Sequence, residues 1–338
     1  MDIQCDACKT VYKIQDGVIP AGKKVRFTCK RCRSAGGDTP APPSPVMPPT
    51  PPPAAAASSA ELPPRERILN GIKDLPAMPQ VLTEIQAQMA GADINTRKIC
   101  GLIEADAAIA TKVLRSANSA FYGQSGKVAT MTGALNLIGL KGLLEVVALA
   151  GAQRLLVGRL PGYGYEAEDL WRHSLAVACG SKLLALRKDP GISETAYLAG
   201  LIHDVGRIIL DRLVLEMKAE IAEFMEREQK TFLDAETRFF GLNHARVAAE
   251  VCRKWKFPPV MAVAIGWHHE PSKSNGDLLA HILHMADHLA TMIGIGYDSD
   301  DVLSQVEAGT MDFLGLKQAD LGDLVSKIAE SVSQASKL

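Results

Sequence analysis

The sequence predicts an all-α domain that follows a small cysteine-rich β segment and a linker. Three observations lead to this architecture. Two Cys-x-x-Cys pairs lie within the first 33 residues, prolines crowd residues 34–64, and apolar residues recur at helical spacing from residue 65 onward. We therefore divide the chain into 1–33, 34–64, a helical domain at 65–270, and a C-terminal helical extension at 271–338 that we expect to pack on that domain.

Composition narrows the classes of protein to consider. The 338 residues carry a formal net charge of -1, which does not suggest a nucleic acid or a membrane as partner. The stretch that comes closest to a membrane span, 134–152, is interrupted by Lys141 and Glu145, so we expect none. Residues 1–5 lack the layout of a signal peptide. We therefore expect a cytoplasmic protein, in which paired cysteines are metal ligands or free thiols rather than disulfides.

The first 33 residues have the pattern of a zinc site. Residues 10–14 and 24–28 alternate like strands, and glycine and proline between them favour turns. The two pairs together offer four thiolates, the tetrahedral set that suits zinc: Cys5, Cys8, Cys29 and Cys32. A strand hairpin clamped by four cysteines is a zinc ribbon, and a segment with so little apolar content should fold only with its metal.

This segment resembles the zinc-ribbon fingers at the N-termini of many bacterial regulatory proteins, in its cysteines, in Val11-Tyr12 and in the Lys-Val-Arg run at 24–26. It is also locally basic, with Lys23, Lys24, Arg26, Lys30, Arg31 and Arg33. These charges could contact nucleic-acid phosphates, or they could balance a dianionic zinc tetrathiolate. No aromatic pair is placed for base stacking, which favours charge balance.

Residues 34–64 predict a disordered spacer, because a stretch so rich in proline and alanine cannot bury a core. A proline-rich ligand for a partner is an alternative to a simple tether. Beyond it, Glu66 to Lys73 predicts a short helix, Pro79 opens a second, and Asn95-Thr96 caps a third. Further helices are expected at 108–117, 131–137, 140–155, 169–186, 194–213, 214–227, 234–240, 244–255, 258–268 and 277–293, and in the C-terminal stretch.

The histidines of the helical domain are its most informative feature. All eight lie between residues 173 and 288. Imidazoles and carboxylates that folding brings together make a divalent metal site. The candidate ligands, in chain order, are His173, His203, Asp204, His244, His268, His269 and Asp287.

Each candidate also has a plain structural interpretation. His203-Asp204 is flanked by apolar residues and glycine, so Asp204 is expected to be buried, either on a metal or in a His-Asp hydrogen bond that ties helices together. His244, which follows the N-cap Asn243, would by itself be an ordinary surface histidine. His284 and His288 share the helix of Asp287 and compete with it, and we interpret His281 as incidental.

The joint order of these residues resembles the HD superfamily of metal-dependent phosphohydrolases, in which a first histidine, a His-Asp pair and a distal aspartate hold a divalent metal. His173, His203, Asp204 and Asp287 match that set, and His244, His268 and His269 match the histidines that hold a second metal in some branches. The tracts 75–79, 118–123, 134–140, 241–244 and 255–258 narrow the resemblance to the HDOD domain, the HD-related output domain of bacterial signalling proteins. It covers roughly residues 66–270.

Two departures separate the chain from the catalytic HD-GYP branch, the cyclic-di-GMP phosphodiesterases. Arg207 stands where that branch has lysine after its His-Asp turn, and no Gly-Tyr-Pro tract follows His269-Glu270. Arginine binds phosphate but is not geometrically equivalent to lysine. The resemblance to HDOD implies a generally non-catalytic output or scaffold module, although this chain keeps an unusually full ligand set.

Three functions stay open at this point. The leading one is a cytoplasmic signalling protein, in which the HDOD domain binds protein partners or a nucleotide and a tethered zinc ribbon contacts a partner. The second is a metal-dependent phosphohydrolase of a nucleotide or cyclic dinucleotide, with iron, manganese or zinc, in which Asp204 bridges the metals and Arg207 neutralises the phosphate. The third is nucleic-acid binding through the ribbon. Cys100, Cys179 and Cys252 are expected to be core thiols.

Overall fold

The computed structural model describes four short strands between residues 2 and 36 and, in the remainder of the chain, residues 63–76, 78, 80–89, 95–119, 127–294 and 306–336. The chain divides into two compact units, Met1–Ala60 and Glu61–Leu338. The four cysteines of the expected zinc site and most of the expected linker, residues 37–62, lie outside the described residues.

The strands of the first unit form two separate antiparallel pairs. β1 (Asp2–Gln4) pairs with β2 (Val11–Lys13), and β3 (Phe27–Thr28) pairs with β4 (Ala35–Gly36). The expected strands at 10–14 and 24–28 contain β2 and β3, but the expectation that these two form one hairpin is wrong. Each instead pairs across the shorter connection that carries a Cys-x-x-Cys pair, and a shorter connection costs less loop-closure entropy. β4 lies within the residues assigned to the linker.

Among the described residues of the second unit all regular elements are helices, and the one β pairing is an isolated bridge between Leu160 and Tyr165. The prediction of an all-α domain is therefore confirmed. Its elements are α1 (Pro64–Asp74), α2 (Gln80–Met89), α3 (Thr96–Glu104), α4 (Ala107–Ala117), α5 (Met131–Leu156), α6 (Asp169–Lys188), η2 (Pro190–Ile192), α7 (Ser193–Ile202), α8 (Gly206–Glu216), α9 (Lys218–Glu228), α10 (Phe232–Phe240), α11 (His244–Lys254), α12 (Pro259–Gly266), η3 (Pro271–Ser274), α13 (Leu278–Met292), α14 (Thr310–Leu314) and α15 (Gln318–Ala335).

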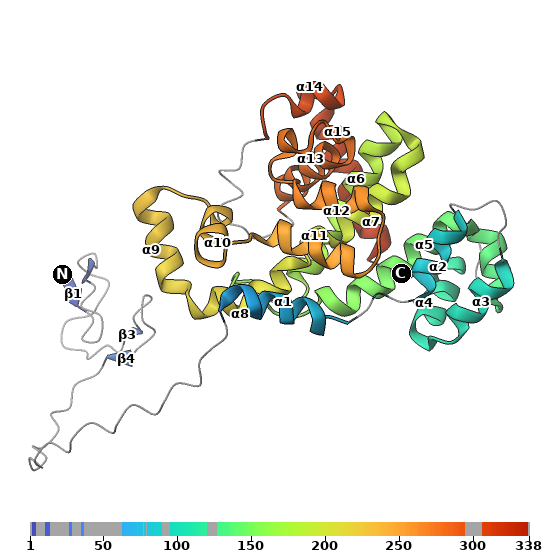
Figure 1. Cartoon of the computed structure of the whole chain (residues 1–338), viewed down its shortest axis with the longest axis horizontal. Coiled ribbons are helices and arrows are strands. Elements are labelled where there is room, and N and C mark those ends of the chain that lie inside the picture. Colours follow the sequence, from blue (N-terminus) through green and yellow to red (C-terminus); the bar gives the residue numbers. More distant parts are fainter. Residues whose placement is uncertain are drawn as a thin grey trace, which may run out of the picture. The chain divides into compact units, whose positions relative to one another are not determined.

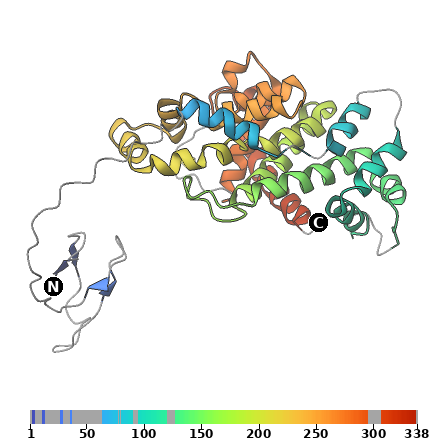
Figure 2. The same ribbon diagram turned by 60° about the horizontal axis from the view of Figure 1, so that its bottom comes forward.

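The helix pair α6 and α7 forms the centre of this unit. α13 and α15 pack on α6, α5 and α12 pack on α7, and α11 packs on both α8 and α12. Figures 1 and 2 show α2 to α4 gathered against α5 at one end and α9 and α10 at the other. Gly200 lets α7 approach α6, since a Cβ there would lie 2.8 Å from the Ala178 Cα. This close crossing positions the end of α7 beside the middle of α6.

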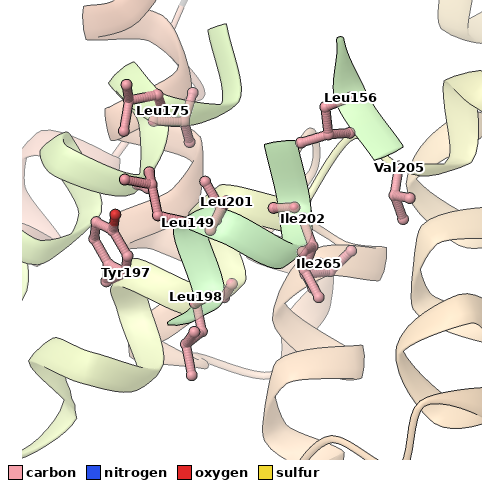
Figure 3. Packing of buried hydrophobic residues seen from close by; sticks show 14 of the residues in the cluster. Leu149, Leu156, Leu175, Tyr197, Leu198, Leu201, Ile202, Val205 and Ile265 are labelled. Carbon is pink, nitrogen blue, oxygen red and sulfur yellow. The ribbon is translucent and has the colours of Figure 1, made fainter. Parts of the chain in front are cut away.

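The core between these helices is aliphatic. Leu149 of α5, Leu175 of α6 and Leu201 of α7 meet in it and are almost fully buried (Figure 3). Ile265 joins them from α12, close to where that helix ends. Each such side chain contributes about 1.5–3 kcal/mol by leaving water. The ends of α7 and α12 are thereby fixed next to each other.

Helix α5 is long and apolar enough to cross a membrane by length and composition, but 56% of its most apolar window is buried inside the protein. It contains a kink at Gly139, where φ is 71° and ψ is 172°. The two helices expected at 131–137 and 140–155 correspond to its two halves. A left-handed φ is accessible to glycine at little cost, which is why the break falls there.

The single helix expected at 194–213 is the main error in the predicted helices. α7 ends at Ile202 and α8 begins at Gly206, so the chain turns at His203, Asp204 and Val205. Apolar spacing continues through the turn because both helices bury their inner faces, which hides the break from a periodicity argument. The turn is where the His-Asp pair lies.

Candidate metal centre

All seven candidate ligands meet at one place in the helical unit. His173 comes from α6, the His203-Asp204 pair from the turn before α8, His244 from the first position of α11, the His268-His269 pair from the turn after α12, and Asp287 from α13. Their donor atoms form three overlapping groups, each within 4.8 Å. His203 and His268 are fully buried and Asp204 is 1% exposed, whereas the Asp287 side chain is 13% exposed.

Asp204 lies between two halves of the cluster. Its Oδ2 is 3.7 Å from His173 Nε2 and 3.5 Å from His203 Nε2. Its Oδ1 is 3.3 Å from His244 Nε2 and 3.9 Å from His268 Nε2. The two oxygens of one carboxylate therefore face two different sets of imidazoles, which is the arrangement of a bridging ligand.

Asp287 completes the half that contains His173. Its Oδ1 is 3.0 Å from His173 Nε2 and 3.8 Å from His203 Nε2. In the other half, the Nε2 atoms of His244 and His269 are 2.8 Å apart. Two imidazole nitrogens at that distance must share either a proton or a cation, because two lone pairs would repel each other.

His203 and His268 are oriented by the same local device. Each follows the end of a helix, and its Nδ1 donates a hydrogen bond to the carbonyl oxygen three residues back, Gly200 at 2.8 Å and Ile265 at 2.7 Å. In each case the acceptor is a carbonyl of the last helical turn, where the regular helical donors end. It also places the proton on Nδ1, so that Nε2 presents its lone pair to the cluster.

His244 is oriented by a residue that the sequence analysis did not identify, Glu236 of α10. Its carboxylate accepts hydrogen bonds from the His244 Nδ1 and backbone nitrogen, both 2.8 Å long, and from the Tyr163 hydroxyl. Glu236 is fully buried. The helical spacing of the sequence could have identified Glu236, because it lies four residues after Phe232 and four before Phe240, on the apolar face of the helix. A charge in that position needs a buried partner.

Gly206 lets the turn approach α11, and Arg207 binds Asp204 of the same turn. A Cβ on Gly206 would lie 2.1 Å from the His244 carbonyl oxygen, so only glycine allows the two helix starts to approach this closely. Arg207 Nε lies 2.9 Å from Asp204 Oδ2, and the guanidinium stands over the rings of Tyr163 and Tyr165 at 5.2 and 5.7 Å. Arg207 is 4% exposed and faces Asp204 rather than solvent.

The remaining three histidines lie outside the ligand groups. His284 of α13 donates from Nδ1 to the His268 carbonyl oxygen and accepts from the Glu307 backbone nitrogen, both at 2.8 Å. His281 contacts the Thr310 hydroxyl at 3.0 Å and stacks on Phe313, which joins α13 to α14. His288 belongs to none of the three donor groups. Asp287 is thus the ligand that α13 contributes.

At Asp204, His203 and His268 the electrostatics favour the protonation states that bind metal. Burial would raise the pKa of Asp204, but Arg207 and the surrounding imidazoles hold that pKa well below its usual range. Burial lowers the pKa of His203 and lowers the pKa of His268 to about 3. Near neutral pH the carboxylate is therefore ionised and these two imidazoles are neutral, as metal ligands must be.

Several donor atoms of the cluster have no hydrogen-bond partner among the described residues. They include His203 Nε2, His268 Nε2 and both oxygens of Asp204, although Arg207 makes its ion pair with one of those oxygens. Buried polar atoms are rarely left in this state, because each costs about 1–3 kcal/mol. Five imidazoles and two carboxylates form a donor set suited to zinc, iron or manganese. The residues fit a divalent metal, with Asp204 placed to serve two ions.

Comparison with known proteins agrees with the fold and the site. Residues 75–271, more than half of the chain, match the HDOD domain. The chain belongs to the HDOD family. Over 205 residues, 60% of this chain, it is 27% identical to an uncharacterized protein of Treponema pallidum and spans 39% of the length of that relative.

Solved structures share the HDOD fold at low identity. An HDOD domain protein of unknown function from Geobacter sulfurreducens has a TM-score of 0.64 at 23% identity, over 80% of this chain and 96% of that one. A Shewanella amazonensis protein, provisionally named a phosphohydrolase, has a TM-score of 0.61 at 23% identity, over 80% of this chain and 98% of that one. A Marinobacter aquaeolei protein, provisionally named a signal transduction protein, has a TM-score of 0.58 at 20% identity, over 81% of this chain and 65% of that one.

Proposed function

We propose that this HDOD protein is a signal-transduction regulator whose helical unit holds a divalent metal centre and acts by binding rather than by catalysis. The burial of the bridging carboxylate carries the proposal. A catalytic metal site keeps a position open to substrate. Here Asp204 is 1% exposed, and Arg207, which would have to neutralise a phosphate, is held by Asp204 and two tyrosines.

The metal centre would act as a structural core that joins five elements. His173, His203 and Asp287 would hold one ion and His244, His268 and His269 a second, with Asp204 between them. A bound divalent cation supplies positive charge and, where a water is coordinated, lowers the pKa of that water. Glu236 and the carbonyls of Gly200 and Ile265 would fix the imidazoles in the orientation that binding needs.

A metal-dependent phosphohydrolase is the second candidate, and one observation favours it. The ligand set is complete, and the cluster approaches solvent at Asp287. The Shewanella amazonensis protein named a phosphohydrolase shares the fold, which by itself does not transfer an activity. In this candidate a nucleotide or cyclic dinucleotide would enter on the side of Asp287, and Arg207 would have to leave Asp204 to reach its phosphate.

We further propose that the first unit is a zinc ribbon in a cytoplasmic protein and contacts a protein partner. The pairing of β1 with β2 and of β3 with β4 supports it, because the chain between each pair contains one Cys-x-x-Cys. The ligands would be Cys5, Cys8, Cys29 and Cys32. Nucleic-acid binding through Lys24 and Arg26 is the alternative, and it would be steeply salt-dependent.

Elemental metal analysis of the full chain tests the metal centre. Four proteins are compared: the wild type, a His203→Ala/Asp204→Ala variant, a Cys5→Ser/Cys8→Ser variant, and a His288→Ala control. We expect the first variant to lose about one or two equivalents of metal, the second to lose about one equivalent of zinc, and the control to lose none. A helical-site variant with the metal content of the wild type would rule out the centre.

Hydrolysis of bis-p-nitrophenyl phosphate by the same proteins separates the two candidate functions. We expect no metal-dependent turnover in the wild type. Turnover that requires iron or manganese and disappears in the His203→Ala/Asp204→Ala variant would decide for the phosphohydrolase. The Cys5→Ser/Cys8→Ser variant controls for zinc released from the first unit.

A further inference from the structure

A cavity of about 620 Å³ lies beside the metal cluster but outside its ligands. It is bounded by residues 162–163 and by α8, α9 and the start of α10. Figure 1 shows these three helices together at one end of the helical unit. Its apolar wall includes Val214, Ile221, Met225 and Phe232, and its polar groups include Lys218, Glu226 and Lys230. Cavities of this size with an apolar wall and a few polar groups are where proteins bind small organic molecules.

Tyr163 belongs both to this cavity and to the surroundings of the metal cluster. Its ring lines the cavity and packs against Phe232, with ring centroids 5.2 Å apart. Its hydroxyl donates to Glu236, whose carboxylate in turn accepts from His244 Nδ1. Two side-chain hydrogen bonds therefore connect the cavity wall to a candidate metal ligand.

The charges of the cavity indicate the class of ligand. Two lysines and one glutamate give it a positive excess. Lys218 Nζ donates to the Pro161 carbonyl oxygen at 3.2 Å, which among the described residues uses one of its three N–H groups, and the other two could bind a ligand. The aliphatic and aromatic wall suits an apolar ring system. An organic anion with an aromatic or alicyclic body satisfies both features.

We propose that this cavity binds a small organic anion with an apolar ring body, and that Tyr163 couples its occupation to the metal cluster. The coupling rests on the proposed metal centre, whereas the binding site does not. A ligand that moves the Tyr163 ring alters the hydrogen bond to Glu236 and thereby the orientation of His244. Linkage requires the effect to be reciprocal: the ligand changes metal affinity by the same factor as the metal changes ligand affinity.

Binding is tested on the full chain with 8-anilinonaphthalene-1-sulfonate, an aromatic sulfonate that fluoresces in apolar sites. We expect saturable binding that Met225→Glu and Lys230→Glu each weaken by about tenfold, because both place negative charge beside the anion. Leu186→Glu, which alters an exposed leucine of α6, is the control and should leave the affinity unchanged. Urea unfolding followed by tryptophan fluorescence verifies that each variant is folded. Absence of binding, or equal binding in folded variants and wild type, overturns the site.

Coupling is tested by titrating Mn²⁺ into the metal-free protein with and without the sulfonate. We expect the sulfonate to change Mn²⁺ affinity by at least about fivefold in the wild type, and this ratio to approach one in Tyr163→Phe. An unchanged Mn²⁺ affinity in the wild type rejects the coupling. Failure to bind Mn²⁺, Fe²⁺ or Zn²⁺, with the sulfonate bound, rejects the metal centre and the coupling together and leaves the cavity site supported.

Discussion

Glu236 accepts two hydrogen bonds from His244, one from its backbone nitrogen and one from its Nδ1, each 2.8 Å long. The first satisfies an N–H at the start of α11, where no helical partner exists. The second fixes the tautomer of the imidazole. One buried carboxylate thus supports the start of α11, alongside the N-cap Asn243, and determines which nitrogen of His244 faces Asp204. The fold and the candidate ligand geometry therefore both depend on Glu236.

Glu236→Gln should weaken metal binding about 10–100-fold while leaving the helical unit folded, because an amide orients the imidazole without the charge that makes it a stronger ligand. Competition with a calibrated chelator measures the effect. Glu250→Gln, an exposed glutamate of α11 that pairs with Arg253, is the matched control. Equal affinity in Glu236→Gln and wild type would show that His244 does not bind the metal or does not need Glu236.

Gly206→Ala should destabilise the helical unit by about 1–3 kcal/mol or more, since the added methyl would lie 2.1 Å from the His244 carbonyl oxygen and force α8 away from α11. Gly322→Ala in α15 is the opposite case. Its methyl meets no atom within 4 Å, so it should stabilise by about 0.5–1 kcal/mol through helix propensity. Urea unfolding compares both, and stabilisation by Gly206→Ala would contradict the close approach.

The metal-free helical unit should lose stability in mild acid. His203 and His268 have folded-state pKa values below the unfolded value of 6.5, that of His268 at about 3. The unfolded chain therefore binds protons that the folded chain excludes, and stability present above about pH 6.5 is lost as the pH falls toward 3. Burial acts downward on the pKa of His244, but Glu236 and Asp204 together raise that pKa above its usual value, which offsets part of the loss.

Tryptophan fluorescence suits this measurement because all three tryptophans, residues 171, 255 and 267, lie in the helical unit. In protein stripped of metal, the free energy of unfolding in urea should fall by a few kcal/mol between about pH 7 and about pH 4. If the free energy of unfolding instead stayed constant or increased as the pH was lowered over this range, the two imidazoles would be protonated in the folded state.

The thiols of the helical unit should resist alkylation until the protein unfolds. Cys100, Cys179 and Cys252 are buried, as expected, and burial raises the pKa of the latter two to about 12. Since the thiolate is the reactive form, iodoacetamide should label them only in denaturant. Peptide mass spectrometry separates them from the four cysteines of the first unit. Rapid labelling of Cys179 in the native protein would contradict its place in the core.

Local sequence signals determined much of this protein. Helical spacing predicted the all-α unit, and Asn95 and Asn243 predicted two helix starts whose caps are present. The restricted distribution of the histidines and the presence of Asp204 in an apolar turn indicated the seven candidate ligands. Such signals can be read directly because a cap, a periodicity or a buried charge depends on residues a few positions apart.

Only the tertiary structure decided how these ligands are arranged. The break at His203 to Val205 is invisible to periodicity, and it occurs where α8 must start against His244. Contacts between helices far apart in the chain decide three features of the cluster. They direct the two oxygens of Asp204 to different imidazoles, they bring Glu236 and Tyr163 behind His244, and they place Asp287 rather than His284 among the ligands. Packing of the core selects these contacts, because no short-range sequence pattern determines the distance between side chains on different helices.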